Sequence, residues 1–338
     1  MNHSVPPPVP VPSPSPCHLI ADIGGTNARF GLVDPDGTIR EEWICKVADY
    51  ADFDEALLAY LDGREITVQN AAVGVGAPVQ DPDSVRLTNY TTWHISARLI
   101  RHLLKADHVA VLNDFHAVAL SIPYFGAADF FHLAGGDKRD DSAPRLIVGP
   151  GTGLGVAGLI RTGDGYIALP GEGGHVTAPV QTPREYAVVR WLLDQKYSHV
   201  SAERLCSGKG LANIYKALCA VDGLADMPER TPEEISLAAL AAPKPCETCA
   251  EALDLMLGFL GRVAGNAALN LAAFGGVYFA GGILPALGKA ALKRSALYRG
   301  FVDKGRFESY LRPIPLYVLT HPRPAFLGLK AYVLAGNR

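Results

Sequence analysis

Residues 19–33 read LIADIGGTNARFGLV, and this stretch is the clearest indicator of the fold. The apolar run from Leu19 to Ile23 predicts a strand, and the glycine pair that follows it predicts a tight turn. The run from Ala28 to Val33 predicts a second strand, which ends at another turn, Asp36-Gly37. The sequence therefore predicts a glycine-tipped β-hairpin near the start of the chain.

A second copy of this pattern occupies residues 146–160, which read LIVGPGTGLGVAGLI. When Gly25-Thr26 is superposed on Gly151-Thr152, Gly37 falls on Gly163, so the turns after both hairpins also coincide. Helical patterns lie between and after the two hairpins. Repetition of one supersecondary unit indicates an internal duplication. We therefore expect an α/β fold with two related halves, each opening with a hairpin.

The glycine-rich turns of the two hairpins suit phosphate. Without side chains, backbone N–H groups can approach an anion closely, and a threonine hydroxyl can donate one more hydrogen bond. One such turn is equally typical of a tight hairpin that needs glycine for its backbone conformation. Two copies at equivalent places, facing each other, favour a clamp on one polyphosphate.

Two other glycine motifs do not support a different nucleotide site. Residues 153–158 match the dinucleotide pattern GxGxxG, but a short strand and a turn follow them instead of a helix. Residues 207–210 read SGKG, but no glycine lies at the required distance upstream, and no Ser or Thr follows Lys209. A bound nucleotide would therefore be held by the hairpins.

Length, charge and cysteine content limit the class of function. The chain has 338 residues and a net charge of -3, so it offers no basic field for nucleic acid or an anionic membrane. The Pro-rich residues 6–16 predict an extended, disordered tail. Six cysteines in so long a chain form no dense disulfide framework and indicate free thiols in a reducing cytoplasm. We expect small-molecule partners, no nucleic acid and no membrane.

The second half of the chain contains clear helix signals. Thr182 and Thr231 each open a capping box with Pro at the first helical position. Residues 251–274 are almost uniformly apolar and predict a core helix; the same stretch could serve an interface, and we expect a homodimer. Cys246 and Cys249 form a CxxC without further zinc ligands nearby, which predicts two thiols on one face of a helix.

An acid interrupts the apolar sequence at Asn113-Asp114. The run from His108 to Leu112 predicts a strand, and ligands of α/β sheets gather at the carboxyl ends of strands. On local sequence alone, Asp114 is also typical of a helix N-cap.

A carboxylate and an imidazole lie at Glu172 and His175, separated by two glycines that allow the backbone to fold tightly. Glu203 supplies another acid. Each has an ordinary alternative, Glu203 as a surface charge and His175 as a loop histidine. As a set, carboxylates that accept from neighbouring hydroxyls, with amide and imidazole donors, suit a sugar ring.

The chain resembles the bacterial glucokinase family of actin and hexokinase-like ATPases from Leu19 to Leu334. The resemblance rests on ADIGGTNARFGLV, VLNDFHAVAL, GPGTGLGVAGLI, LPGEGGH, SAERLCSGKGL and VYFAGGILPAL, which occur in the family's order. It implies two RNase-H-like α/β domains with an active-site cleft between them. The small domain would comprise residues 19–120 and 322–338, and the large domain 121–321. Residues 1–18, the Pro-rich tail, have no counterpart in the family.

The resemblance also implies a reaction, transfer of the γ-phosphoryl group of ATP to the 6-hydroxyl of D-glucose in cytoplasmic glycolysis. The implied glucose pocket contains Asn113, Asp114, Glu172, His175 and Glu203, with Asp114 as the general base. Asp22 resembles the acid that holds Mg²⁺ through water. The implied nucleotide site consists of Asp22, Gly24, Gly25, Thr26, Asn27, Gly151, Thr152, Gly153, Gly281 and Gly282. No Lys or Arg in these motifs is a clear phosphate clamp.

Alternative functions stay open at this point. A kinase for another hexose would share these motifs, although the ROK kinases carry a cysteine-rich zinc motif that this sequence lacks. A non-catalytic sugar-sensing protein on the same fold is a second alternative. A DNA-binding repressor of this kind would need a helix-turn-helix before the first hairpin, where only the Pro-rich tail lies. ATP, ADP and polyphosphate are all open as phosphoryl donors.

Overall fold

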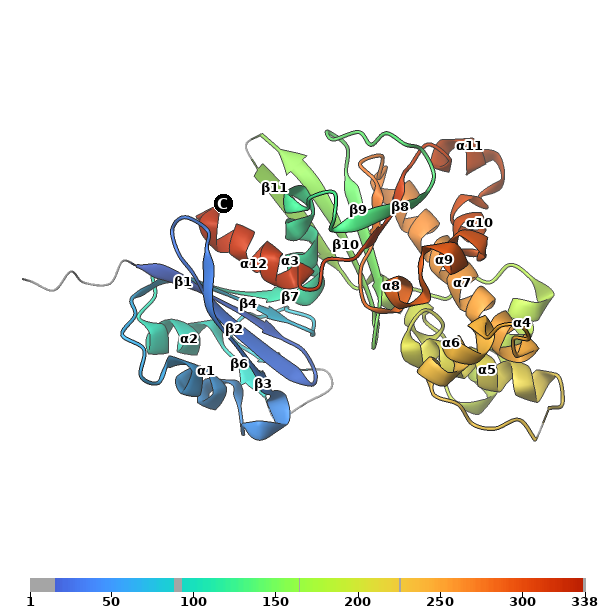
Figure 1. Cartoon of the computed structure of the whole chain (residues 1–338), viewed down its shortest axis with the longest axis horizontal. Helices are drawn as coiled ribbons and strands as arrows, with labels where there is room; N and C mark the ends of the chain where they lie inside the picture. The colour runs from blue at the N-terminus through green and yellow to red at the C-terminus, as the bar shows by residue number, and fades with distance from the viewer. Residues whose placement is uncertain (1–15, 88–92, 164, 225, 337–338) are drawn as a thin grey trace, which may run out of the picture. The chain divides into compact units, whose positions relative to one another are not determined.

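The computed structural model describes residues 16–87, 93–163, 165–224 and 226–336. The chain divides into two compact units, unit 1 (Met1–Asp114 and Leu329–Arg338) and unit 2 (Phe115–Gly328) (Figure 1). The sequence placed the boundaries at residues 120 and 322 instead. They differ because two helices, α3 (Asp114–Ser121) and α12 (Pro324–Leu334), cross the division. A Cβ on Gly328 would lie 1.7 Å from the carbonyl oxygen of Ala117, so these helices pack backbone to backbone.

The N-terminal tail ends earlier than expected. Residues 1–15 of the predicted tail lie outside the described residues, but Cys17 and His18 already belong to β1 (Cys17–Ile23). The side chain of Cys17 is fully buried, and its backbone N–H donates to the carbonyl oxygen of Thr67 at 3.0 Å. Cys17 and His18 are part of the sheet because they pair with β4.

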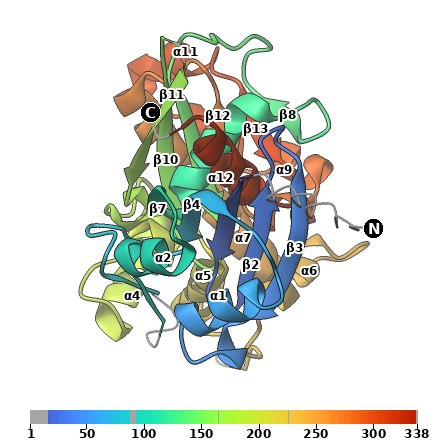
Figure 2. The same ribbon diagram turned by 90° about the vertical axis from the view of Figure 1, so that its left-hand side faces the viewer.

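Unit 1 is built on a five-stranded sheet in the order β3-β2-β1-β4-β7. β1 pairs antiparallel with β2 and parallel with β4; β2 pairs antiparallel with β3, and β4 parallel with β7. Figure 2 shows the strands from β7 on the left to β3 on the right. The other strands of this sheet are β2 (Asn27–Val33), β3 (Ile39–Lys46), β4 (Val68–Val75) and β7 (His108–Asn113).

Helices cover both faces of the unit 1 sheet (Figure 1). α1 (Phe53–Leu61) and α2 (Ala97–Leu104) lie on one face. The short elements of this unit are η1 (Val47–Asp49), β5 (Val85–Arg86) and β6 (His94–Ile95). Asp52 and Ser96 cap these two helices by accepting from backbone N–H groups. The end of α12 lies on the other face, where Leu329 fills the space above Gly74.

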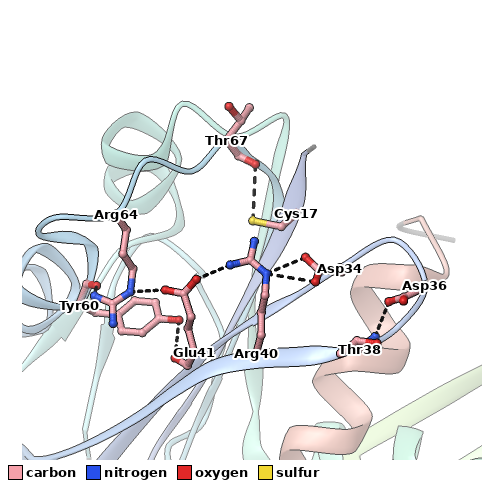
Figure 3. A network of polar contacts seen from close by, with 9 residues as sticks. All are labelled: Cys17, Asp34, Asp36, Thr38, Arg40, Glu41, Tyr60, Arg64 and Thr67. Carbon is pink, nitrogen blue, oxygen red and sulfur yellow. Dashed lines mark hydrogen bonds and ion pairs between the residues drawn. The ribbon is translucent and has the colours of Figure 1, made fainter. Parts of the chain in front are cut away.

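A network of polar contacts ties the outer strand β3 to the rest of unit 1 (Figure 3). Arg40 donates to Asp34 at 2.9 Å and also pairs with Glu41. Arg64 Nε donates to Glu41 at 2.7 Å, and the Tyr60 hydroxyl donates to the Glu41 carbonyl at 3.0 Å. Burial raises the pKa of Tyr60 to about 12. Glu41 has φ of 52°, a conformation that non-glycine residues rarely adopt, and these contacts hold it there.

Unit 2 repeats the topology of unit 1. Its six-stranded sheet has the order β11-β10-β9-β12-β13-β8, and β9 pairs antiparallel with β10 and parallel with β12, as β1 pairs with β2 and β4. β8 is an additional antiparallel edge strand. Gly37 and Gly163 both have positive φ in the turns after the two hairpins. The predicted duplication is confirmed in strands β8 (Phe130–Ala134), β9 (Arg145–Pro150), β10 (Leu154–Thr162), β11 (Gly165–Gly171), β12 (Val277–Phe279) and β13 (Leu316–Leu319).

The helices of unit 2 begin where the sequence signals predicted them. Both capping boxes form, at Thr182 and at Thr231. The long helices are α4 (Pro183–Gln195), α5 (Gly208–Val221), α6 (Pro232–Leu240) and α7 (Glu247–Leu271). Short elements complete the unit: η2 (Ile122–Tyr124), η3 (Gly173–His175), η4 (Ala202–Arg204), α8 (Ile283–Leu287), α9 (Lys289–Arg294), α10 (Leu297–Val302), η5 (Gly305–Phe307) and α11 (Glu308–Leu311).

The long apolar helix α7 lies in the core of unit 2. Its length and composition would allow it to cross a membrane, but 72% of its most apolar window is buried inside the protein. A Cβ on Gly261 would lie 2.0 Å from the carbonyl oxygen of Leu297, so α10 packs directly on the α7 backbone. Arg262 forms a buried ion pair with Glu185 of α4 at 2.7 Å. The predicted core helix is confirmed, and it ends at Ala272, which has φ of 50°.

Candidate active site

Three parallel strands of unit 1 end at the same level. Ile23 of β1 is in register with Val75 of β4, which is in register with Asn113 of β7. The N–H of Gly76, just beyond β4, donates to the carbonyl oxygen of Ile23 at 3.1 Å. The first glycine turn and Asn113-Asp114 therefore share one edge of the sheet, the edge at which α/β sheets bind ligands.

The first glycine turn leaves its surface open. Gly25, Thr26 and Asn27 are exposed, and the Gly24 N–H donates to the Asn27 carbonyl at 3.0 Å. Gly24 does not have positive φ, and a Cβ there would make only an ordinary contact with the Asn27 carbonyl. Neither backbone conformation nor packing accounts for glycine at this position. Room for a ligand beside the backbone would account for it.

Asp22 lies beneath the first turn and is paired with a cation that the sequence analysis missed. The β1–β2 register places Asp22 opposite Arg29, and their side chains form an ion pair at 3.3 Å. Burial raises the pKa of Asp22, while the charge of Arg29 opposes that rise. The Nε of Arg29 is buried without a hydrogen-bond partner. Arg29 was recognisable only from the antiparallel register, because seven positions separate it from Asp22.

A direct protein cage for a metal is not found in the described part of the chain, where no three His, Cys, Asp or Glu residues gather suitably. Near the first glycine turn, the sequence predicts a Mg²⁺ contact for one carboxylate, that of Asp22. One carboxylate fits a Mg²⁺ ion that binds mainly to phosphate oxygens and keeps several waters.

Asn113 and Asp114 lie at the junction of β7 and α3. The Asn113 Nδ2 donates to the carbonyl oxygen of Ala77 at 3.2 Å, which fixes its amide. Asp114 is the first residue of α3, and its Oδ2 lies 3.7 Å from the place that a Cβ on Gly76 would take. A helix N-terminus favours negative charge, so the backbone at this position stabilises an ionised carboxylate.

The residue after Asp114 is held in unit 2 by two glycines. A Cβ on Gly149 of β9 would lie 2.3 Å from the ring of Phe115, and a Cβ on Gly155 of β10 would lie 2.1 Å from it. Neither glycine has positive φ. Both are glycine because the Phe115 ring lies directly on the two strands, which explains Gly155 in the misleading GxGxxG pattern.

The second glycine turn is open in the same way as the first. The Gly151 N–H donates to the Gly153 carbonyl at 2.8 Å, and nothing lies within 4 Å of a Cβ on Gly151. Thr152 is exposed. The N–H of Gly208, the first residue of α5, donates to the Gly151 carbonyl at 2.9 Å. The SGKG segment, which the sequence analysis set aside, thus begins a helix beside this turn.

Gly281 and Gly282 follow β12 at the same edge of the unit 2 sheet. Phe279 is in register with Val148 of β9, and the N–H of Ala280 donates to the Val148 carbonyl at 2.9 Å. Gly281 has φ of 86°, and a Cβ there would lie 2.5 Å from the carbonyl oxygen of Pro150. Gly282 has nothing within 4 Å of its Cβ position. This turn therefore adjoins the second glycine turn.

The three other predicted sugar ligands gather around the start of β10. Glu203 Oε2 accepts from the Leu154 N–H at 3.1 Å, and a Cβ on Gly153 would lie 2.5 Å from that oxygen. The exposed side chains of Glu172 and His175 approach each other to 3.8 Å. The structure therefore brings Glu172, His175 and Glu203 into one region of unit 2, while Asn113 and Asp114 belong to unit 1.

The two glycines between Glu172 and His175 have a packing role. A Cβ on Gly174 would lie 2.1 Å from the carbonyl oxygen of Leu154, and a Cβ on Gly173 would lie 2.7 Å from the Val156 side chain. Any larger residue would push this turn away from β10. The two glycines thus hold the acid and the imidazole beside β10, a packing role that the sequence did not predict.

Comparisons with known proteins identify the family of the chain. The family model for glucokinase matches residues 19–335. A glucokinase of Psychromonas ingrahamii is 42% identical over 93% of this chain and 96% of its own length; one of Aromatoleum aromaticum is 44% identical over 92% of each. The crystal structure of a glucokinase from an Antarctic psychrotroph has a TM-score of 0.81 and 31% identity, covering 93% of this chain and 98% of that one.

A duplicated α/β topology with two open glycine turns, combined with these similarities, places the protein in the class of sugar kinases. The chain belongs to the glucokinase family.

Proposed function

We propose that this protein transfers the γ-phosphoryl group of ATP to the 6-hydroxyl of D-glucose, giving glucose 6-phosphate and ADP. The observation that carries the proposal is the shared edge in unit 1, where an acid and an open glycine turn meet at the ends of parallel strands. In this proposal the two units are RNase-H-like domains of the actin and hexokinase-like type. Glucose binds in a cleft between them, and their closure excludes water.

The proposed sugar contacts follow from donor and acceptor chemistry. Carboxylates of Glu172 and Glu203 each accept from neighbouring sugar hydroxyls, and His175 completes the set on unit 2. Glu203 already accepts the Leu154 N–H with one oxygen, which leaves its other oxygen to a hydroxyl. Asn113 is oriented by the hydrogen bond from its Nδ2 to the Ala77 carbonyl, and in this proposal its amide also hydrogen-bonds to the sugar.

Asp114 acts as the general base in this mechanism. Its carboxylate accepts the proton of the 6-hydroxyl as the oxygen attacks the γ-phosphorus in line with the leaving ADP. Asp114 lies at the start of α3, and a helix N-terminus favours the negative charge that a base needs. Phe115 is a positioning residue, because its ring on Gly149 and Gly155 fixes the backbone next to Asp114.

The nucleotide contacts use backbone more than side chains. The first turn (Gly24, Gly25, Thr26 and Asn27) and the second (Gly151, Thr152 and Gly153) donate N–H groups and hydroxyls to the phosphates, and Gly281-Gly282 receives the adenosine. Asp22 would hold Mg²⁺ through water, and the ion would neutralise charge on the phosphate oxygens. Arg29 holds the Asp22 carboxylate in place at the base of the turn.

A panel of hexoses and donors tests this function. Purified protein is incubated with Mg-ATP and glucose, fructose, mannose or N-acetylglucosamine, and ADP release is measured; ADP and polyphosphate then replace ATP. We expect turnover with glucose and ATP to exceed every other pair. Faster turnover of another hexose would instead support the second candidate, a kinase for that sugar.

The assembly and the compartment are also proposed. We expect a homodimer formed through surface other than α7, whose apolar residues are mostly buried in unit 2. Leu237 and Leu240 of α6 are exposed apolar side chains that could serve it. Light scattering after size exclusion gives the mass directly. All six cysteines are free thiols, which fits the reducing cytoplasm where ATP and glucose meet.

A further inference from the structure

One short segment of unit 2 contacts the second glycine turn on both of its sides. This segment, residues 203–208, runs from η4 to the start of α5. At one end, Glu203 Oε2 accepts from the Leu154 N–H at 3.1 Å. At the other end, the Gly208 N–H donates to the Gly151 carbonyl at 2.9 Å. The second glycine turn and a proposed sugar ligand are therefore attached to one segment.

Ser207 joins the two ends of the 203–208 segment. It is almost completely buried, with 1% of its surface exposed. Its hydroxyl donates to the Glu203 carbonyl at 2.8 Å and accepts from the Gly210 N–H at 3.0 Å, so Ser207 is also the N-cap of α5. A serine hydroxyl has one proton to donate, and here Glu203 receives it. The hydroxyl thus ties the backbone of the sugar ligand to the helix that contacts the second glycine turn.

Close packing leaves the 203–208 segment little freedom to move. A Cβ on Gly210 would lie 2.5 Å from the carbonyl carbon of Leu205, so the first turn of α5 lies directly on the segment. Leu205 itself is fully buried. The N–H of Ala202, just before the segment, donates to the Val176 carbonyl at 2.8 Å and anchors the segment to the end of η3. Interiors packed in this way transmit a displacement from one contact to the next.

Uncharged groups orient Glu203. Its carboxylate accepts from a backbone N–H, and the Ser207 hydroxyl fixes its carbonyl. The neighbouring cation, Arg204, lies over the Tyr197 ring, with its guanidinium carbon 4.6 Å from the ring centroid. Hydrogen bonds weaken steeply when their distance or angle changes. The contacts of Glu203 with sugar hydroxyls therefore depend on where the backbone places this residue.

We propose that Ser207 is a positioning residue that holds the Glu203 carboxylate and the second glycine turn in one arrangement. This role rests on the proposed function, in which Glu203 binds sugar and the second glycine turn binds phosphate. Phosphate on the turn fixes the backbone up to Leu154, and with it the orientation of Glu203, so the nucleotide strengthens glucose binding. Because coupling between two binding sites is reciprocal, glucose strengthens nucleotide binding by the same factor.

Steady-state kinetics of Ser207→Ala test the positioning role. This variant loses the hydrogen bond to the Glu203 carbonyl together with the N-cap of α5. We expect the KM for glucose and the KM for ATP each to rise about fivefold, the effect of one lost hydrogen bond, while kcat stays within about twofold. Ser207→Thr keeps the hydroxyl and should restore most of both KM values.

Two matched variants separate positioning from a loss of stability. In Ser236→Ala, a serine of α6 loses the same kind of bond, from its hydroxyl to the Pro232 carbonyl at 2.8 Å. In Thr182→Ala, α4 loses its N-cap, and the melting temperature should fall about as much as in Ser207→Ala. Neither control should change the KM for glucose or for ATP.

Calorimetry measures the coupling itself. Glucose is titrated into the protein with and without Mg²⁺ and the non-hydrolysable ATP analogue AMP-PNP. We expect the analogue to tighten glucose binding by the unchanged chain, and this factor to be about threefold smaller in Ser207→Ala. Equal factors in the two proteins, or KM values of Ser207→Ala that match those of Ser236→Ala, would overturn the role of Ser207, while turnover of glucose by the unchanged chain would still support the proposed function. If the unchanged chain turned over no glucose, the proposed function would fail and the role of Ser207 with it.

Discussion

The two hairpins share one topology but use their glycines differently. In unit 1, a Cβ on Gly24 would meet only the Asn27 carbonyl of the same turn, so no side chain from another element lies over it. In the unit 2 hairpin, Gly151 has nothing within 4 Å of its Cβ position, while Gly153 admits Glu203 and Gly155 admits Phe115. Both hairpins therefore keep a glycine turn that other elements leave uncovered, which is the turn proposed to bind phosphate. The surrounding glycines of unit 2 instead allow other elements to place an acid and an aromatic ring on the hairpin.

The largest effect is expected at the acid that unit 1 contributes. Asp114→Asn should lower kcat by about 100-fold to 10,000-fold, the usual contribution of a general base, with glucose binding largely kept. Steady-state kinetics and glucose titration by calorimetry measure both. Asp107→Asn, an exposed acid just before the opposite end of β7, is the matched control. Near-normal turnover of the Asp114 variant would mean that Asp114 only stabilises the start of α3 and is not the general base.

The next prediction concerns the side chain of Phe115, which packs on the hairpin of unit 2. In Gly155→Ala, the new Cβ would occupy the position of the Phe115 ring and displace the backbone next to Asp114. We expect kcat to fall by about 10-fold to 100-fold with little change in the KM for ATP, because misplaced groups lose orientation. Gly165→Ala, at a glycine with nothing within 4 Å, is the control. If both variants behaved alike, Phe115 would have no positioning role.

The residues in these two predictions show which features could be predicted from the sequence and which could not. The hairpins and the strand before Asn113 were predictable because strand runs and turns are local patterns. Asp114 was identified as a candidate because it follows the end of that strand. The place of Phe115 on Gly149 and Gly155 was not, because it depends on contacts between distant segments. The ion pair of Asp22 with Arg29 required the strand register, and the boundary at Asp114 required knowing that α3 crosses between units.

The open glycine shared by both hairpins gives a smaller effect. Gly151→Val should raise the KM for ATP about 10-fold, since a charged hydrogen bond to phosphate is weakened, while glucose affinity stays constant. The fold should tolerate the change, because nothing lies within 4 Å of the Cβ position. Gly25→Val makes the equivalent change in unit 1. An unchanged ATP dependence in both variants would argue against a clamp formed by two turns.

The smallest effect concerns Arg29, the cation that pairs with Asp22 in the unit 1 hairpin. Burial raises the pKa of Asp22 and Arg29 opposes that rise, so Arg29→Leu should raise it further. Protonated Asp22 cannot hold Mg²⁺. As the pH falls, the variant should therefore need about threefold more Mg²⁺, and this need should begin at a higher pH than in the unchanged chain. Comparing both proteins at each pH removes the protonation of ATP itself. Identical Mg²⁺ profiles would exclude this role for the Asp22–Arg29 pair.

The central claim is that this chain phosphorylates the 6-hydroxyl of glucose, and the product itself tests it most directly. The protein, Mg-ATP and glucose are incubated together, and ³¹P and ¹H NMR spectra follow the reaction. The account predicts one new phosphomonoester whose phosphorus couples to the C6 protons of glucose, formed in equal amount with ADP. Conversion of ATP to free phosphate without a sugar ester, or an ester at another hydroxyl, would contradict it.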